Sequence, residues 1–158
     1  MSLGDERQEH DHTELLREKT PNSRKFHERA VETTPLGVES NVRGFDPYPF
    51  YIDSAEGSYV YDIDDNEYLD FLLALGPIIL GHGHPEVREA VKQQVDTCDL
   101  TATPQPIAIE YMEKVKEMIP SAERVRLANS GSEATMHAMR VARSYTGKDK
   151  IAKPEGGY

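Results

Sequence analysis

Residues 124–134 read RVRLANSGSEA, and this stretch decides the fold that the sequence predicts. The apolar and β-branched content of residues 124–128 is typical of a short strand. Beyond residue 134, small and apolar side chains recur on one helical face until Gly147, a natural helix stop. A further strand is expected to begin near Lys148. A strand that runs through Ser-Gly-Ser into a helix indicates an α/β fold.

The junction between this strand and its helix has the chemistry of a phosphate site. The first turn of a helix presents backbone N–H groups without partners and a partial positive charge, and both favour an anion. Gly131 lets the backbone approach the anion closely, and the hydroxyls of Ser130 and Ser132 add donors. The alternative is that Ser132 only caps the helix, and the residues alone leave both interpretations open. The sequence has neither of the two nucleotide-binding glycine fingerprints.

Two further helices are predicted upstream of this junction. Pro85 suits the first position of one helix, and residues 107–119 form the other, which Pro120 ends. Apolar residues recur at helical spacing in both: Val87, Val91, Val95 and Cys98 in the first, and Ala108, Tyr111, Met112, Val115, Met118 and Ile119 in the second. We expect both stripes to pack in a core, and to be partly uncovered where their partners are missing.

The N-terminal part has a different pattern of charged, apolar and turn-forming residues. Charged helices are predicted at residues 14–19 and 24–32, the second capped by Asn22-Ser23, and a linker or an ordered loop at residues 35–49. Aromatic and β-branched residues between Gly, Asp and Asn turns then predict a three-stranded antiparallel meander over residues 50–71. His10 and His12 have no further ligands nearby, so no metal site is expected.

Composition and charge exclude several classes of function. The chain has 158 residues, a length typical of one domain, and a formal net charge of −10, which argues against nucleic acid and anionic membranes as partners. No apolar run approaches a bilayer span, and the first residues lack the apolar segment of a secretory signal. Cys98 is the single cysteine, so an internal disulfide is impossible and a cytoplasmic location is expected.

Several motifs in one order give the sequence a specific resemblance. They are GHGHP at residues 81–85, NSGSEA at 129–134, AMRVAR at 138–143, TGKDKI at 146–151 and EGGY at 155–158. Over residues 26–158 the chain resembles the class III aminotransferases, enzymes that depend on pyridoxal 5′-phosphate (PLP). Residues 37–43 and 126–136 are most similar to the aminomutase branch, which converts glutamate-1-semialdehyde to 5-aminolevulinate for tetrapyrrole biosynthesis.

The resemblance implies a fold and a set of roles. The fold would be the first part of a fold-type I PLP-dependent transferase: a helical arm and small antiparallel sheet over residues 1–72, then the start of the large mixed-sheet domain over residues 73–158. Ser130, Gly131 and Ser132 would hold the cofactor phosphate, and Tyr158 would lie against the pyridine ring. Arg43 and Ser40 would bind the substrate, with Arg43 gripping its carboxylate. The substrate would be a small amino acid or aminoaldehyde, and the full-length enzyme a homodimer.

The sequence departs from the aminomutase pattern at two places. Ala74 and Leu75 stand where serine and tryptophan are usual, and Asn41 stands where proline is usual. Since these changes reshape a substrate pocket, an aminotransferase acting on another amino acid stays open as an alternative.

No catalytic residue is assigned in this chain. The lysine that forms the Schiff base in the family, and the aspartate that pairs with the pyridine nitrogen, would both lie beyond Tyr158. Lys148, Lys150 and Lys153 do not match their context. The chain by itself is therefore predicted to be inactive, and a non-catalytic remnant or interaction subunit is a further hypothesis.

Overall fold

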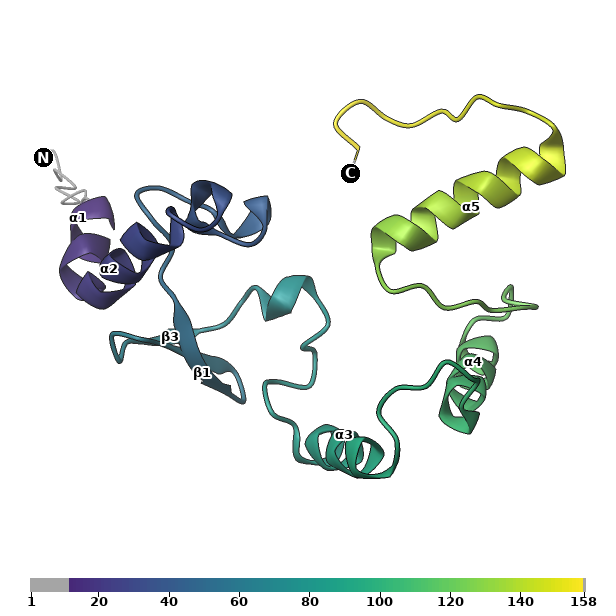
Figure 1. Ribbon diagram of the computed structural model, residues 1–158, viewed down its shortest axis with the longest axis horizontal. Helices are drawn as coiled ribbons and strands as arrows, with labels where there is room; N and C mark the ends of the chain where they lie inside the picture. The colour runs from purple at the N-terminus through teal and green to yellow at the C-terminus, as the bar shows by residue number, and fades with distance from the viewer. Residues whose placement is uncertain (1–11, 158) are drawn as a thin grey trace, which may run out of the picture. The chain divides into compact units, whose positions relative to one another are not determined.

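The structure is a computed structural model, and it describes residues 12–157. Within those residues the chain forms five α-helices and one three-stranded sheet (Figure 1). It divides into two compact units, the residues up to Asp99 and those from Leu100 onward.

The first unit opens with a helical arm. Helix α1 spans His12–Lys19 and α2 spans Pro21–Ala30, with Pro21 at the first position of α2. The break between them falls where the sequence predicted it. The second helix begins three residues earlier than predicted, because the proline φ suits the first helical turn and Thr20 takes the cap position. The expected cap from Asn22-Ser23 is therefore wrong, and a carboxylate from the sheet performs that task.

The predicted meander is confirmed. Strands β1 (Ile52–Glu56), β2 (Tyr59–Asp62) and β3 (Glu67–Leu69) form an antiparallel sheet in the order β1-β2-β3. The cross-strand pairs include Glu56 with Tyr59, and Tyr61 with Glu67. A two-stranded hairpin is at best marginally stable in water, whereas a three-stranded sheet can be stable when one of its faces is covered.

The turn between β2 and β3 joins the sheet to the arm. The Asp64 carboxylate accepts hydrogen bonds from Asn22 N (2.7 Å), Ser23 N (2.9 Å) and Ser23 Oγ (2.8 Å) at the start of α2. Asn66 Nδ2 donates to the carbonyl of Lys19 at the end of α1, at 2.9 Å. These contacts satisfy helix-end groups that would otherwise lack partners. The buried residues of this unit cluster around the junction: Thr20, Ser23, Gly37, Val38, Tyr48, Pro49 and Asp62.

The loop predicted at residues 35–49 contains two short 3₁₀ turns, η1 (Pro35–Gly37) and η2 (Asn41–Arg43). After the sheet come a third, η3 (Leu73–Leu75), and helix α3 (Pro85–Thr97), which begins at Pro85 as predicted. The valine stripe of α3 is exposed in this structure.

The second unit contains helices α4 (Pro106–Met118) and α5 (Gly131–Thr146). Gly147 ends α5 with a left-handed φ of 66°, as predicted. The strands expected at residues 124–128 and from Lys148 onward are not formed, so that part of the prediction is wrong for this structure. A strand requires a hydrogen-bonded neighbour, and the described part of this unit supplies none.

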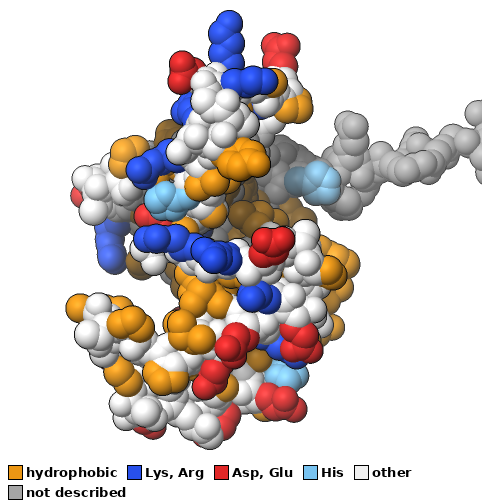
Figure 2. All heavy atoms as spheres, turned by 90° about the vertical axis from the view of Figure 1, so that its right-hand side faces the viewer, with side chains coloured by type: hydrophobic (Ala, Val, Ile, Leu, Met, Phe, Trp, Pro, Cys, Tyr) orange, Lys and Arg blue, Asp and Glu red, His pale blue; other side chains and the backbone are white. Residues whose placement is uncertain are grey.

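Apolar side chains remain open to the surface of both units. Figure 2 shows hydrophobic side chains among charged ones on one face of the molecule. Within residues 100–157 no side chain is buried, and Tyr111, Met118 and Ile119 of the α4 stripe are exposed. Neither stripe is buried within the described residues, so the expectation that both pack in a core is wrong for this structure, while the expectation that they are partly uncovered is confirmed.

Candidate functional site

Ser130, Gly131 and Ser132, the residues predicted to form an anion site, lie at the start of α5. Ser130 takes the cap position with φ −149° and ψ 159°, and its Oγ accepts from the Glu133 backbone N–H at 3.2 Å. The cap is therefore Ser130, so the alternative that Ser132 only caps the helix is wrong, and the phosphate site stays a prediction. Gly131 and Ser132 become the first two helical positions.

The two N–H groups of Gly131 and Ser132 point out of the helix start without an acceptor among residues 12–157. A Cβ built on Gly131 would meet nothing within 4 Å, so the space beside its backbone is open. Two free N–H groups, the Ser132 hydroxyl and the positive end of a sixteen-residue helix can together hold a phosphate.

Glu133 is a site residue that the sequence reasoning missed. Its Oε2 accepts from the Asn129 backbone N–H at 2.8 Å, while its own N–H donates to Ser130. The pattern Ser-x-x-Glu at residues 130–133, the sequence signature of a capping box, could have indicated this arrangement. Because the carboxylate is tied to Asn129, one side of the helix start is already occupied by negative charge.

The predicted substrate residues share one turn in the first unit. Ser40 precedes η2, and its carbonyl accepts from Arg43 N at 2.9 Å. The Arg43 guanidinium is exposed and pairs with the Glu39 carboxylate. The pKa of Glu39 lies below its usual value, first through a backbone hydrogen bond and then through the charge of Arg43. Arg43 therefore already has an anionic partner that a substrate carboxylate would replace.

The structure thus groups the predicted residues in two places. Ser40 and Arg43 belong to the first unit, and the Ser130–Ser132 turn belongs to the second. Tyr158 and His10 lie outside the described residues. Lys153, which does not match the context of the Schiff-base lysine, donates from Nζ to the Gly157 carbonyl at 2.8 Å.

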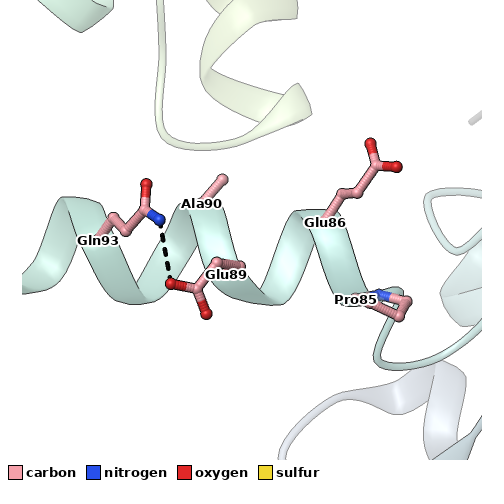
Figure 3. Close-up of a pocket in the computed structure, with 5 residues that line it drawn as sticks. All are labelled: Pro85, Glu86, Glu89, Ala90 and Gln93. Atoms are coloured by element: carbon pink, nitrogen blue, oxygen red, sulfur yellow. Dashed lines mark hydrogen bonds between the residues drawn. The ribbon is translucent and has the colours of Figure 1, made fainter.

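A hollow of about 460 Å³ on α3 is a separate feature (Figure 3). Its lining residues are Pro85, Glu86, Glu89, Ala90 and Gln93, all from one helix, and Gln93 donates to Glu89 across it at 3.0 Å. Since a single helix face encloses little, this hollow is not the candidate site. Within residues 12–157 no cluster of three or more metal-ligating side chains occurs. No helix in that range is both long and apolar enough to span a membrane.

With the geometry described, the comparison with known proteins places the chain in a class. The family model of class-III aminotransferases matches residues 41–158, and the chain belongs to this family. The structure has the fold of the corresponding part of PLP-dependent transaminases, as the resemblance implied.

Particular relatives refine this placement. The chain is 51% identical to the glutamate-1-semialdehyde 2,1-aminomutase of Methanopyrus kandleri over 87% of its own length and 32% of the relative. It matches a transaminase solved with PLP bound at 39% identity and a TM-score of 0.85, covering 88% of this chain and 33% of the other. An omega-transaminase from Sphaerobacter thermophilus matches at 35% identity and a TM-score of 0.83, with coverages of 87% and 31%. The chain therefore spans about a third of the length of the proteins that it matches.

Proposed function

We propose that this chain is part of a PLP-dependent enzyme that moves an amino group within glutamate-1-semialdehyde to give 5-aminolevulinate, a tetrapyrrole precursor. The observation that carries the proposal is the start of α5, where Ser130 caps the helix and leaves two N–H groups free. That turn lies in a chain 51% identical to an aminomutase over 87% of its length.

The residues at this turn fit the phosphate of PLP. The Gly131 and Ser132 N–H groups would donate to its oxygens, and the Ser132 hydroxyl would add a third donor. The open space beside Gly131 lets the phosphate come close to the backbone. When bound, PLP supplies an electron sink that stabilises negative charge on the carbon that carries the amino group. The task of these residues is to bind the cofactor and fix its orientation.

Arg43 and Ser40 are proposed to bind the substrate. Arg43 presents a planar, always charged group that matches a carboxylate in two parallel hydrogen bonds. Its pairing with the exposed Glu39 is weak in water, so a substrate carboxylate can displace it. Tyr158 is proposed to lie against the pyridine ring of the cofactor.

A class III aminotransferase acting on another amino acid is the second candidate. Ala74 and Leu75 favour it, since they replace the serine and tryptophan usual in the aminomutase. Two of the solved relatives named above are transaminases by their descriptions.

A chimera distinguishes these candidates. The matched third of the Methanopyrus kandleri aminomutase would be replaced by residues 26–158 of this chain, and the purified protein would be tested for retained PLP. It would then be offered glutamate-1-semialdehyde alone, and separately an amino acid with a 2-oxo acid acceptor. The proposal expects retained PLP and formation of 5-aminolevulinate without an acceptor.

The other outcomes are equally informative. Amino transfer to the acceptor without 5-aminolevulinate would favour the aminotransferase. Retained PLP with neither reaction would favour a non-catalytic remnant or interaction subunit. A control chimera with Ala74→Ser and Leu75→Trp, tested in parallel, shows whether those two positions alone determine the reaction.

The remaining features of the proposal concern the whole enzyme. We expect a cytoplasmic homodimer in which the large domain begins near residue 73. The 158-residue chain alone is expected to be inactive, because none of its lysines has the context of the catalytic lysine. Borohydride treatment of the chain with PLP tests this point: labelling of a single lysine would contradict it.

A further inference from the structure

Residues 70–82 form a loop whose two ends are anchored on the same turn of the sheet. Asp70 N donates to the Ser58 carbonyl at 2.9 Å. At the other end, His82 N donates to the Gly57 carbonyl at 2.7 Å, and Gly57 N donates to the His82 carbonyl at 3.0 Å. The β1–β2 turn therefore holds both the entry and the exit of the loop.

The return of the loop requires glycine. Gly81 has φ +84°, and a Cβ there would lie 2.9 Å from the Gly57 carbonyl oxygen. The two backbones approach each other so closely that no side chain fits between them. The exit of the loop is thus fixed against the sheet by close contact as well as by hydrogen bonds.

The middle of the loop has a strained backbone. Leu73, Ala74 and Leu75 have φ values of 51°, 52° and 66°. In this left-handed region the Cβ crowds the following carbonyl, so three consecutive residues with side chains are unusual. Such a conformation persists only where the surrounding structure holds it.

Burial of apolar side chains supplies little of that hold. Phe71 is exposed by 87% and Ile79 by 78%, and Leu72, Leu75 and Leu80 are exposed too, whereas Leu73 and Ile78 are half-buried. Polar contacts therefore contribute most of what keeps this backbone left-handed: the hydrogen bonds within the turn, from Leu75 N to the Leu72 carbonyl and from Gly76 N to the Leu73 carbonyl, and the contacts at its base.

Asp70 and His82 provide those contacts. Asp70 Oδ1 accepts from the N–H of Leu72 (2.8 Å), which precedes the left-handed run, and from that of Leu73 (3.0 Å), its first residue. Asp70 Oδ2 lies 2.7 Å from His82 Nε2, and the two side chains are only 10% and 19% exposed. One carboxylate thus ties the entry of the strained turn to the exit of the loop. Consistent with this, the pKa of Asp70 lies below its usual value, mainly because of the hydrogen bond from His82.

We propose that the Asp70–His82 pair is a latch that holds residues 71–81 in their left-handed conformation, with the apolar side chains turned outward. When the latch opens, the carboxylate is free to turn away from Leu72 and Leu73, and the backbone relaxes toward right-handed values. His82 acts here as a positioning residue, and its effect on the loop passes through Asp70. The inference does not depend on the proposed function.

The test compares three substitutions of His82 in the full 158-residue chain. His82→Gln places an amide N–H where Nε2 lies, His82→Asn places the same group one methylene short, and His82→Leu removes the donor. Amide hydrogen exchange at Leu72 and Leu73, followed by NMR, is the readout. We expect exchange about tenfold faster or more in the Leu and Asn variants, as for loss of a hydrogen bond to a charged group, and near the original rate in the Gln variant.

A second readout separates the latch from general loss of structure. The Asp64 and Asn66 amides donate to Asp62 in the same unit, and their exchange reports whether the sheet and arm remain folded. In the unsubstituted chain the His82 ring nitrogens, observed by ¹⁵N NMR, should show a proton on Nε2. Unchanged exchange at Leu72 and Leu73 in His82→Leu would overturn the proposal, and so would equal acceleration in the Gln and Leu variants.

Discussion

Residues 19–70 and residues 106–157 both contain helices and apolar side chains, but only the first region forms hydrogen bonds between distant parts of the chain. Asn66 reaches Lys19 across 47 positions, and Asp64 reaches Asn22 across 42. Within the described residues 106–157, the most distant hydrogen bond joins Arg143 and Asp149, six positions apart. The first region is thus stabilised by its own tertiary contacts, while the second has only helix signals and uncovered apolar faces.

Of the substitutions that test this contrast, the one at Asp62 should cause the largest loss of unfolding free energy. This residue is 2% exposed, and its carboxylate accepts from Asp64 N, Asn66 and Tyr68 Oη. Asp62→Ala leaves several half-buried donors without a partner, so the first unit should lose about 3 kcal/mol of unfolding free energy. Urea unfolding followed by tyrosine fluorescence measures this loss.

The control is Asp53→Ala, which removes an exposed aspartate from the neighbouring strand β1. A surface change of this kind costs within about 0.5 kcal/mol. Equal losses in the two variants would mean that the turn at residues 62–66 does not hold the arm to the sheet.

A smaller effect is expected where the loop returns to the sheet. Gly81→Ala adds a Cβ 2.9 Å from the Gly57 carbonyl oxygen at a φ of +84°, so it should cost about 2 kcal/mol. Gly57→Ala is the matched variant, because its φ of +56° is also left-handed but its Cβ would meet nothing within 4 Å. It should cost only about 1 kcal/mol, the conformational part alone. If thermal unfolding shows equal losses, the two backbones do not meet as closely as described.

Acid should destabilise the first unit by protonating the Asp62 carboxylate. Burial raises the pKa of Asp62, but its hydrogen bonds from Asn66, Tyr68 and Asp64 outweigh burial and bring the pKa below the usual 3.8. A lowered folded-state pKa means that the stabilisation is complete above pH 3.8 and is lost as the pH falls through the folded-state value.

The loss should be smaller than that of Asp62→Ala, because protonation leaves the side chain in place. Unfolding free energies measured in urea at a series of acidic pH values, for the chain and for Asp62→Asn, test this. The asparagine variant should lose less stability over that range. Parallel pH profiles would assign the acid sensitivity to other carboxylates.

In the second unit, we expect one substitution to lower the stability of helix α5 by about 1 kcal/mol. Ser130→Ala removes the side chain that caps α5, and a lost cap costs about that much helix stability. Ser132→Ala is the control, since its hydroxyl caps nothing among the described residues. Amide exchange at Glu133, the donor to Ser130, should accelerate only in the first variant. With PLP added, we expect the opposite ranking of the two variants. Ser132→Ala should then have the larger effect, because the Ser132 hydroxyl is proposed to donate to the phosphate.

The sequence predicted those features that local residues determine. Pro85 starts a helix and Gly147 ends one because each restricts its own backbone, and the meander follows from strand segments separated by short turns. The cap on α2 was not predictable, because Asp64 comes from 42 positions away. The strand at residues 124–128 was predicted from content alone, yet a strand exists only with a neighbour. At the site, Ser130 and Gly131 were found by pattern, whereas the pairing of Arg43 with Glu39 was missed although its spacing of four residues is visible.

The smallest effect is expected at Val141, and the same substitution at Val38 in the first region is its matched comparison. Val38 is 7% exposed and Val141 is 67% exposed. Val38→Ala removes buried methyl groups and should cost about 2 kcal/mol. Val141→Ala removes methyl groups that touch mainly water, and alanine favours a helix more than valine does, so α5 should gain up to about 0.5 kcal/mol. Urea unfolding of the first unit and helix melting by circular dichroism measure the two changes. A clear loss at Val141 would mean that the apolar face of α5 is covered in solution, and that the contrast between the two regions is weaker than their contacts indicate.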